Sequence, residues 1–152
     1  MQISFQIPVL NLSNKDSLHF AYTQRSFWQL YTTSAYFRET NYAPELFFRH
    51  LVSKNFTWKL SVLHQSNGRG SELQRGWNRL YGEAIFSGTH WMVSFKPWVV
   101  FKDADKARNN DITHFLGNGK ILLAYKLGSN VFSLMTRNNV QSNFKRGAEE
   151  LT

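Results

Sequence analysis

The segment FTWKLSVLHQS, residues 56–66, indicates the fold class because apolar and polar side chains alternate along it. The apolar face carries every second residue, Phe56, Trp58, Leu60 and Val62. The residues between them, Thr57, Lys59 and Ser61, form the polar face. A period of two residues is typical of a β-strand whose two faces meet different environments.

The same alternation recurs along the chain, and no long window has helical periodicity. It predicts an all-β fold with about eight strands, near 2–10, 17–30, 40–52, 56–66, 77–87, 90–101, 118–127 and 131–140. Several of these approach the ~9–11 residues that a tilted strand needs to cross a bilayer. Short and long connections roughly alternate, so an up-and-down meander would gather its long loops at one rim. Outer-membrane barrels have this asymmetry, although a soluble meander can also show it.

The composition favours anionic binding partners but does not identify a single class. The 152 residues are enough for one domain, 1–152, and contain no cysteine. With 18 Lys and Arg against 10 Asp and Glu, the net charge of +8 favours nucleic acid, phospholipid head groups or lipopolysaccharide. A nucleic-acid binder would place basic and aromatic side chains on one face. Phe56 and Trp58 instead lie opposite Lys59, which argues against nucleic acid.

The polar C-terminal end of the segment 56–66 suggests a catalytic site. His64 and Ser66 continue the outward series past Val62, about 7 Å apart on one face. Asn78 begins the outward face of the next predicted strand at the same rim. Such a histidine can accept the serine proton while the amide orients the ring, which is the arrangement of a serine hydrolase. Alternatively, these are ordinary rim residues of a non-catalytic, porin-like barrel that contacts lipopolysaccharide.

Five segments resemble one known family, in family order: FAYTQRSFWQL, FRETNYAPELFF, HQSNGRGSELQRGWNRLYGE, KPWVVF and DIT. The chain is similar to the outer-membrane phospholipase A family, the calcium-dependent lipases of Gram-negative outer membranes. The resemblance implies an antiparallel up-and-down transmembrane β-barrel with a Ser-His-Asn triad on its lipid-facing surface. It also implies hydrolysis of phospholipid acyl ester bonds to lysophospholipid and free fatty acid.

The resemblance further implies a role for each site residue. Ser66 would be the nucleophile, His64 the general base and Asn78 the group that orients the histidine. The backbone N–H of Gly68 would form the oxyanion hole together with water held by Ca²⁺. The calcium ligands would be Ser34 from a partner chain, the Arg69 carbonyl, Gln74 where the family usually has serine, and Asp105 or Asp103.

The family acts as a homodimer, and Gln24 matches a glutamine at its interface. An amide on an apolar stripe is favoured where it pairs across such an interface, or as a rim residue near the head groups. The family closes twelve strands behind a signal peptide. This chain has about eight strands, without a signal-peptide pattern, and FKRGAEELT resembles the opening of a ninth. It is therefore expected to be either a fragment, incomplete at the C-terminus, or a shortened form, located in the outer membrane.

Overall fold

The computed structural model describes all residues except 32, 35, 102–111, 138–144 and 146. The described part of the chain forms one nine-stranded sheet. Its strands are β1 Gln2–Asn11, β2 Asp16–Gln29, β3 Tyr36–Ser53, β4 Phe56–Ser66, β5 Gly76–Ser87, β6 Trp91–Val100, β7 Gly119–Leu127, β8 Asn130–Arg137 and β9 Ala148–Leu151. Two short helices, η1 Ser71–Leu73 and α2 Ile112–Leu116, lie in the connections.

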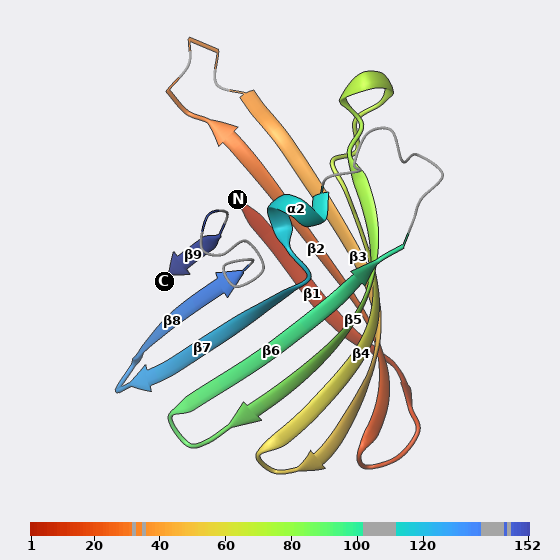
Figure 1. The fold of residues 1–152 in the computed structure, drawn as a ribbon, viewed down its shortest axis with the longest axis vertical. Helices are drawn as coiled ribbons and strands as arrows, with labels where there is room; N and C mark the ends of the chain where they lie inside the picture. Colours follow the sequence, from red (N-terminus) through yellow and green to blue (C-terminus); the bar gives the residue numbers. More distant parts are fainter. Residues whose placement is uncertain (32, 35, 102–111, 138–144, 146) are drawn as a thin grey trace.

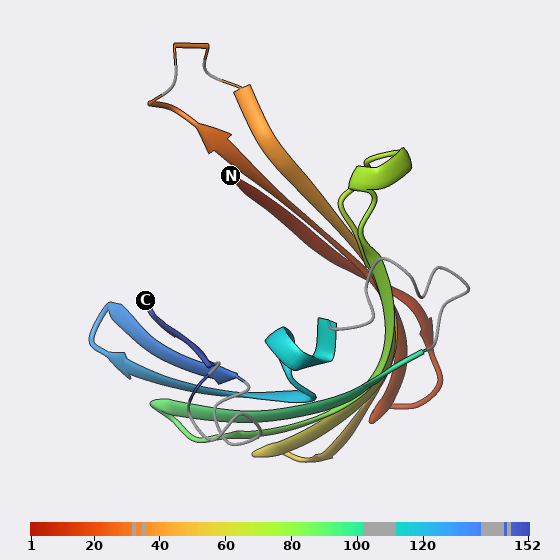
Figure 2. The same ribbon diagram turned by 45° about the horizontal axis from the view of Figure 1, so that its top comes forward.

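Each strand pairs with the next in antiparallel orientation, so the strand order follows the sequence from β1 to β9. The sheet curves strongly and has a concave and a convex side (Figures 1 and 2). The prediction of an all-β up-and-down architecture is confirmed. The tail that resembled the opening of a ninth strand contains β9, while the two short helices were not predicted.

The two faces of the sheet have opposite character. On β4, Leu60 and Val62 point outward and are 49% and 50% exposed, whereas Ser61 on the concave face is 2% exposed. A sheet that exposes its apolar side chains in this way is suited to an apolar solvent such as lipid. None of the helices in the described part of the chain has the length and apolar character of a membrane span.

The buried core lies on the concave side, behind the strands that carry the candidate site. It is a cluster of large side chains from β4, β5 and β6, namely Leu63, Trp77, Tyr81 and Trp98. Ile112 and Leu116 of α2 pack against this cluster, and Figure 2 shows α2 inside the curve of the sheet. The core therefore supports β4 and β5 from the face opposite to the predicted catalytic residues.

The long connections β2–β3, β4–β5 and β6–β7 leave the sheet at the same end, while the turns β1–β2, β3–β4, β5–β6 and β7–β8 lie at the opposite end (Figure 1). One predicted boundary is wrong. β3 begins at Tyr36 rather than near residue 40, because its pairing with β2 continues past a bulge between Phe27 and Trp28. Trp28 and Phe37 stack on this extension, with ring centroids 5.6 Å apart.

Candidate active site

The candidate site lies on the convex face, where β4 and β5 reach the rim with the long connections. β4 and β5 pair without interruption, and this register places His64 opposite Asn78 and Ser66 opposite Gly76. Tyr42 of β3 flanks Ser66 on the other side. The sequence alternation that turns Leu60 and Val62 outward also turns His64 and Ser66 outward. The structure thus places all three predicted triad residues on the apolar face.

His64 and Asn78 are in direct contact. The distance from His64 Nδ1 to Asn78 Oδ1 is 2.7 Å. An amide oxygen only accepts hydrogen bonds, so the neutral imidazole carries its proton on Nδ1 and donates it to Asn78. The other ring nitrogen, Nε2, is then free of a proton and can act as a base. A cross-strand amide therefore fixes the histidine tautomer that acyl transfer requires.

Ser66 lies next to His64 on the same face, with Gly76 opposite. A Cβ atom at position 76 would lie 3.5 Å from Ser66 Cβ and 3.8 Å from His64 Cε1. The imidazole edge and the serine side chain thus border the same space, which the missing side chain of Gly76 leaves open. In the described part of the chain no hydrogen bond joins Ser66 to His64; such contacts often tighten only when substrate binds.

A buried asparagine that the sequence analysis missed holds the loop after Ser66. Asn67 is 8% exposed, and its side-chain amide donates to the carbonyl of Leu73 at 2.8 Å. Its Oδ1 accepts from the backbone N–H of Arg75 at 2.9 Å and of Arg69 at 3.3 Å. The backbone N–H of Asn67 donates to the Arg75 carbonyl at 2.9 Å. Asn67 therefore closes the loop at both ends.

Replacing Asn67 by alanine should loosen the loop. The variant loses the side-chain bonds to three backbone groups, so the free energy of unfolding should fall by ~1–3 kcal/mol. Urea unfolding in detergent micelles, followed by tryptophan fluorescence, measures the change. Asn14→Ala in an exposed short turn is the matched control, with an expected change within ~0.5 kcal/mol. If the two variants lost the same free energy of unfolding, Asn67 would not hold the loop in the way described.

Gly68 occupies a loop position where a residue with a side chain would be strained. Its φ of +61° lies in the left-handed region, which side chains avoid. A Cβ there would lie 2.5 Å from Cε2 of Tyr42, well inside contact distance. The glycine thus lets the backbone after Ser66 turn sharply against the Tyr42 ring. Its N–H lies two residues from the candidate nucleophile, in the segment predicted to form an oxyanion hole.

The other predicted site residues are described less completely. Ser34 lies exposed between β2 and β3, and Gln74 lies exposed between η1 and β5. The guanidinium of Arg69 donates to the carbonyl of Arg38. Asp103 and Asp105 lie outside the described residues. In the described ranges, no group of three or more His, Asp or Glu side chains forms a metal site.

Gln24 lies on the convex face in register with Tyr42, which in turn pairs with Ser66. Its Oε1 accepts a hydrogen bond from the Tyr22 hydroxyl at 3.2 Å, so part of the amide is satisfied within the chain. Gln24, Tyr42 and Ser66 thus form a row across three strands.

An antiparallel meander whose convex face exposes apolar side chains, and whose concave face carries the buried core together with polar and charged groups, defines the outer-membrane β-barrel class. The family model for phospholipase A1 matches residues 1–152, and the chain belongs to the phospholipase A1 family. Phospholipase A1 of Proteus vulgaris is 37% identical over 158 residues, covering 97% of this chain and 54% of the relative. That of Escherichia coli K12 is 36% identical with the same coverage.

Solved structures show the same fold. The Salmonella typhi outer membrane phospholipase dimer with bound calcium matches with a TM-score of 0.87 and 34% identity, over 99% of this chain and 61% of that chain. Outer membrane phospholipase A from Escherichia coli matches with a TM-score of 0.86 and 34% identity, over 99% of this chain and 65% of that chain. The chain is an outer-membrane protein that spans about half the length of its curated relatives.

Proposed function

We propose that this chain carries the catalytic machinery of a calcium-dependent phospholipase A, with Ser66, His64 and Asn78 as its triad. The observation that carries the proposal is the 2.7 Å contact between His64 Nδ1 and Asn78 Oδ1, beside Ser66 on the apolar face. A nucleophile at the rim of this face would meet the ester bonds of membrane phospholipids. A solved active-site mutant of the Escherichia coli relative replaces an asparagine by alanine, which supports an asparagine in this role.

In the first half of the reaction, Ser66 Oγ attacks the ester carbonyl carbon and its proton passes to His64 Nε2. Asn78 holds the imidazole by the Nδ1 proton, so the ring keeps its orientation while positively charged. The backbone N–H of Gly68 donates to the oxyanion that forms. The bond to the glycerol oxygen then breaks, and His64 returns the proton to that oxygen. The products are a lysophospholipid and an acyl-Ser66 intermediate.

In the second half, water attacks the acyl carbonyl and gives a proton to His64. The bond to Ser66 Oγ breaks, His64 protonates the serine, and the fatty acid leaves. An amide in place of the usual carboxylate provides no negative charge for the imidazolium. Stabilisation of the oxyanion must therefore contribute more of the rate in this site than it does in a Ser-His-Asp triad.

Calcium fits the chemistry of the loop. Ca²⁺ binds oxygen ligands, and the Arg69 carbonyl and the Gln74 side chain are such donors within the loop that Asn67 closes. Ser34 of a second copy and Asp105 or Asp103 would complete the set. Bound calcium would supply a fixed positive charge close to the oxyanion. Because Ser34 would come from a second copy, the calcium site would require a homodimer, with Gln24 at the dimer interface. Lipopolysaccharide would surround the barrel.

Calcium removal gives the test of this function. The chain, refolded into mixed micelles of detergent and phospholipid, should release fatty acid with calcium present. A chelator should reduce the release to background, and added calcium should restore it, as measured by titration of the acid produced. Equal release with and without chelator would contradict the calcium role. A folded chain that releases no fatty acid in either condition would favour the non-catalytic barrel.

A further inference from the structure

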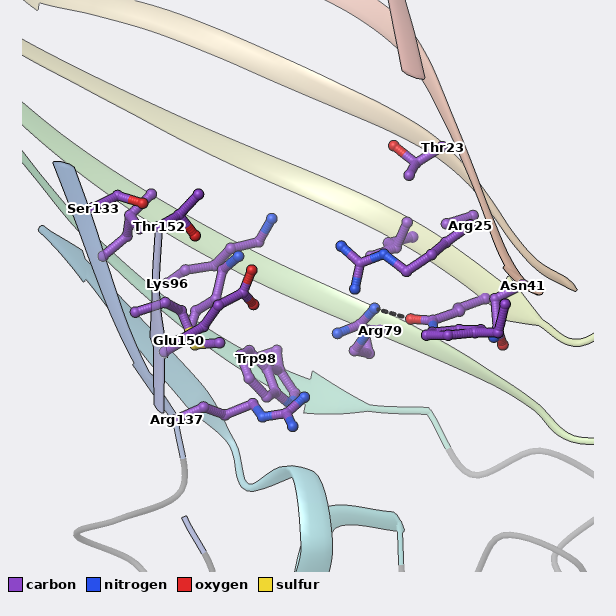
Figure 3. A pocket seen from close by; sticks show the side chains of 17 residues that line it. Thr23, Arg25, Asn41, Arg79, Lys96, Trp98, Ser133, Arg137, Glu150 and Thr152 are labelled. Atoms are coloured by element: carbon purple, nitrogen blue, oxygen red, sulfur yellow. Dashed lines mark hydrogen bonds between the residues drawn. The ribbon is translucent and has the colours of Figure 1, made fainter. Parts of the chain in front are cut away.

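The concave face of the sheet contains a basic cavity that the proposed reaction does not use. Its volume is about 460 Å³, roughly that of fifteen water molecules in the liquid. Its basic side chains come from five strands, β2, β5, β6, β7 and β8, and are Arg25, Arg79, Lys96, Lys120 and Arg137. One acidic side chain, Glu150 of β9, lines the same space. Figure 3 shows several of these groups directed toward one another.

Neutral groups hold several of these cations. The Arg25 guanidinium donates twice to Gln2 Oε1, and Arg79 donates to Gln65 Oε1 at 2.9 Å. Arg79 also lies 3.8 Å above the Trp77 ring, and Lys96 lies 3.4 Å above the Tyr81 ring. Within the described ranges, none of the five cations forms a direct ion pair. Neutral partners thus hold Arg25, Arg79 and Lys96, and Glu150 is the one carboxylate side chain among the described residues that line the cavity.

The other carboxylates on the concave face already have partners. Glu83 lies 3.5 Å from Lys59 and accepts a hydrogen bond from Ser94 at 2.6 Å. Glu45 accepts hydrogen bonds from Tyr81 and Ser61. These contacts engage both carboxylates, and neither of them lines the cavity. Partly buried cations of this kind usually acquire a counter-charge.

Three buried donors around the cavity are also unsatisfied. In the described part of the chain, Arg79 Nε, Arg137 Nε and Trp98 Nε1 have no hydrogen-bond acceptor, and Trp98 is only 5% exposed. All three residues line the cavity and come from three different strands. Buried N–H groups in folded proteins nearly always have an acceptor. Excess positive charge together with unused donors indicates that the missing group is an anion rich in acceptors.

We propose that this cavity is a binding site for a phosphate-class oxyanion, with Arg79, Trp98 and Arg137 as its donors. A tetrahedral oxyanion offers acceptors in several directions, which suits donors that approach from different strands. Lys96 and Lys120 add positive charge without fixed geometry. The ligand reaches this site from water, because the cavity lies on the face opposite to the apolar surface. The site is independent of Ser66, His64 and Asn78.

Phosphate binding to the refolded chain in phosphate-free detergent tests the proposal. Inorganic phosphate should bind saturably, as seen by calorimetry, and should raise the unfolding temperature more than chloride at equal ionic strength. Arg137→Gln and Lys120→Gln should each weaken binding about tenfold, since each removes one charged contact. Arg49→Gln removes the same charge outside the cavity lining, so its phosphate affinity should match the parent chain.

Glycerol 3-phosphate, measured in parallel, distinguishes a free phosphate from a phosphate ester. Binding of both ligands supports the site and shows that it accepts a phosphate ester. Binding of inorganic phosphate alone supports the site and shows that an ester substituent does not fit. Absence of saturable binding by either ligand would overturn the proposal. It would also be overturned if the Arg49 variant lost as much affinity as the two cavity variants. Two cavity variants guard against misfolding of one, and near-ultraviolet circular dichroism of each checks that it has folded.

Discussion

Replacing Ser66 by alanine is expected to abolish phospholipid hydrolysis while leaving the fold intact. The substitution removes the proposed nucleophile, and loss of such a group typically lowers the rate by at least about 10⁴-fold. Ser66 is the last residue of β4, and in the described part of the chain no hydrogen bond joins it to His64. Alanine therefore disturbs little else. Fatty acid release from mixed micelles with calcium measures the loss.

Ser53→Ala is the control for this substitution. Ser53 ends β3 at the opposite end of the sheet and is exposed, so its replacement should leave the rate near that of the parent chain. Matching circular dichroism spectra would show that both variants fold. If the Ser66 variant kept more than a few per cent of the parent activity, another group would have to be the nucleophile.

Replacing Gly68 by alanine is expected to have the second largest effect, on both rate and stability. The left-handed φ of +61° costs a residue with a side chain about 1–2 kcal/mol, and the new methyl group would overlap the Tyr42 ring. The loop must move to relieve this overlap, which would turn the proposed oxyanion donor away. Loss of one such donor lowers the rate by about 10²–10³-fold.

Gly70→Ala makes the same chemical change two residues away. A Cβ at Gly70 would have no heavy atom within 4 Å, so this variant should retain near-parent stability and rate. Steady-state hydrolysis and urea unfolding are measured for both variants. A loss seen only in the Gly68 variant comes from the overlap with Tyr42 and the left-handed φ, because both variants replace a glycine by alanine. Equal behaviour of the two variants would contradict the role given to Gly68.

The sequence alone could predict the strands and their two faces because alternation is a local property. The outward series through Leu60 and Val62 extends to His64 and Ser66 without knowledge of any other strand. Asn78 could be predicted as the third member of the site because β5 begins at the rim where β4 ends. The pairing of the two strands then places Asn78 opposite His64. This part of the site depends on strand periodicity and on one short-range pairing.

Other features depend on contacts that periodicity does not encode. The early start of β3 follows from a bulge in β2 and from stacking of Trp28 on Phe37. The role of Asn67 needs the loop to return to Arg75 before its amide has partners. The basic cavity requires the register of several strands at once, because its cations lie far apart in the sequence.

Covalent labelling shows directly whether Ser66 is an activated nucleophile. An alkyl sulfonyl fluoride, which reacts with activated serines, should modify the refolded chain once, and peptide mapping by mass spectrometry should place the label on Ser66. His64→Ala should slow the labelling strongly, since the hydroxyl then lacks a base. Label on a different residue, or equal labelling rates with and without His64, would contradict an outward-facing Ser66 activated by His64 and Asn78.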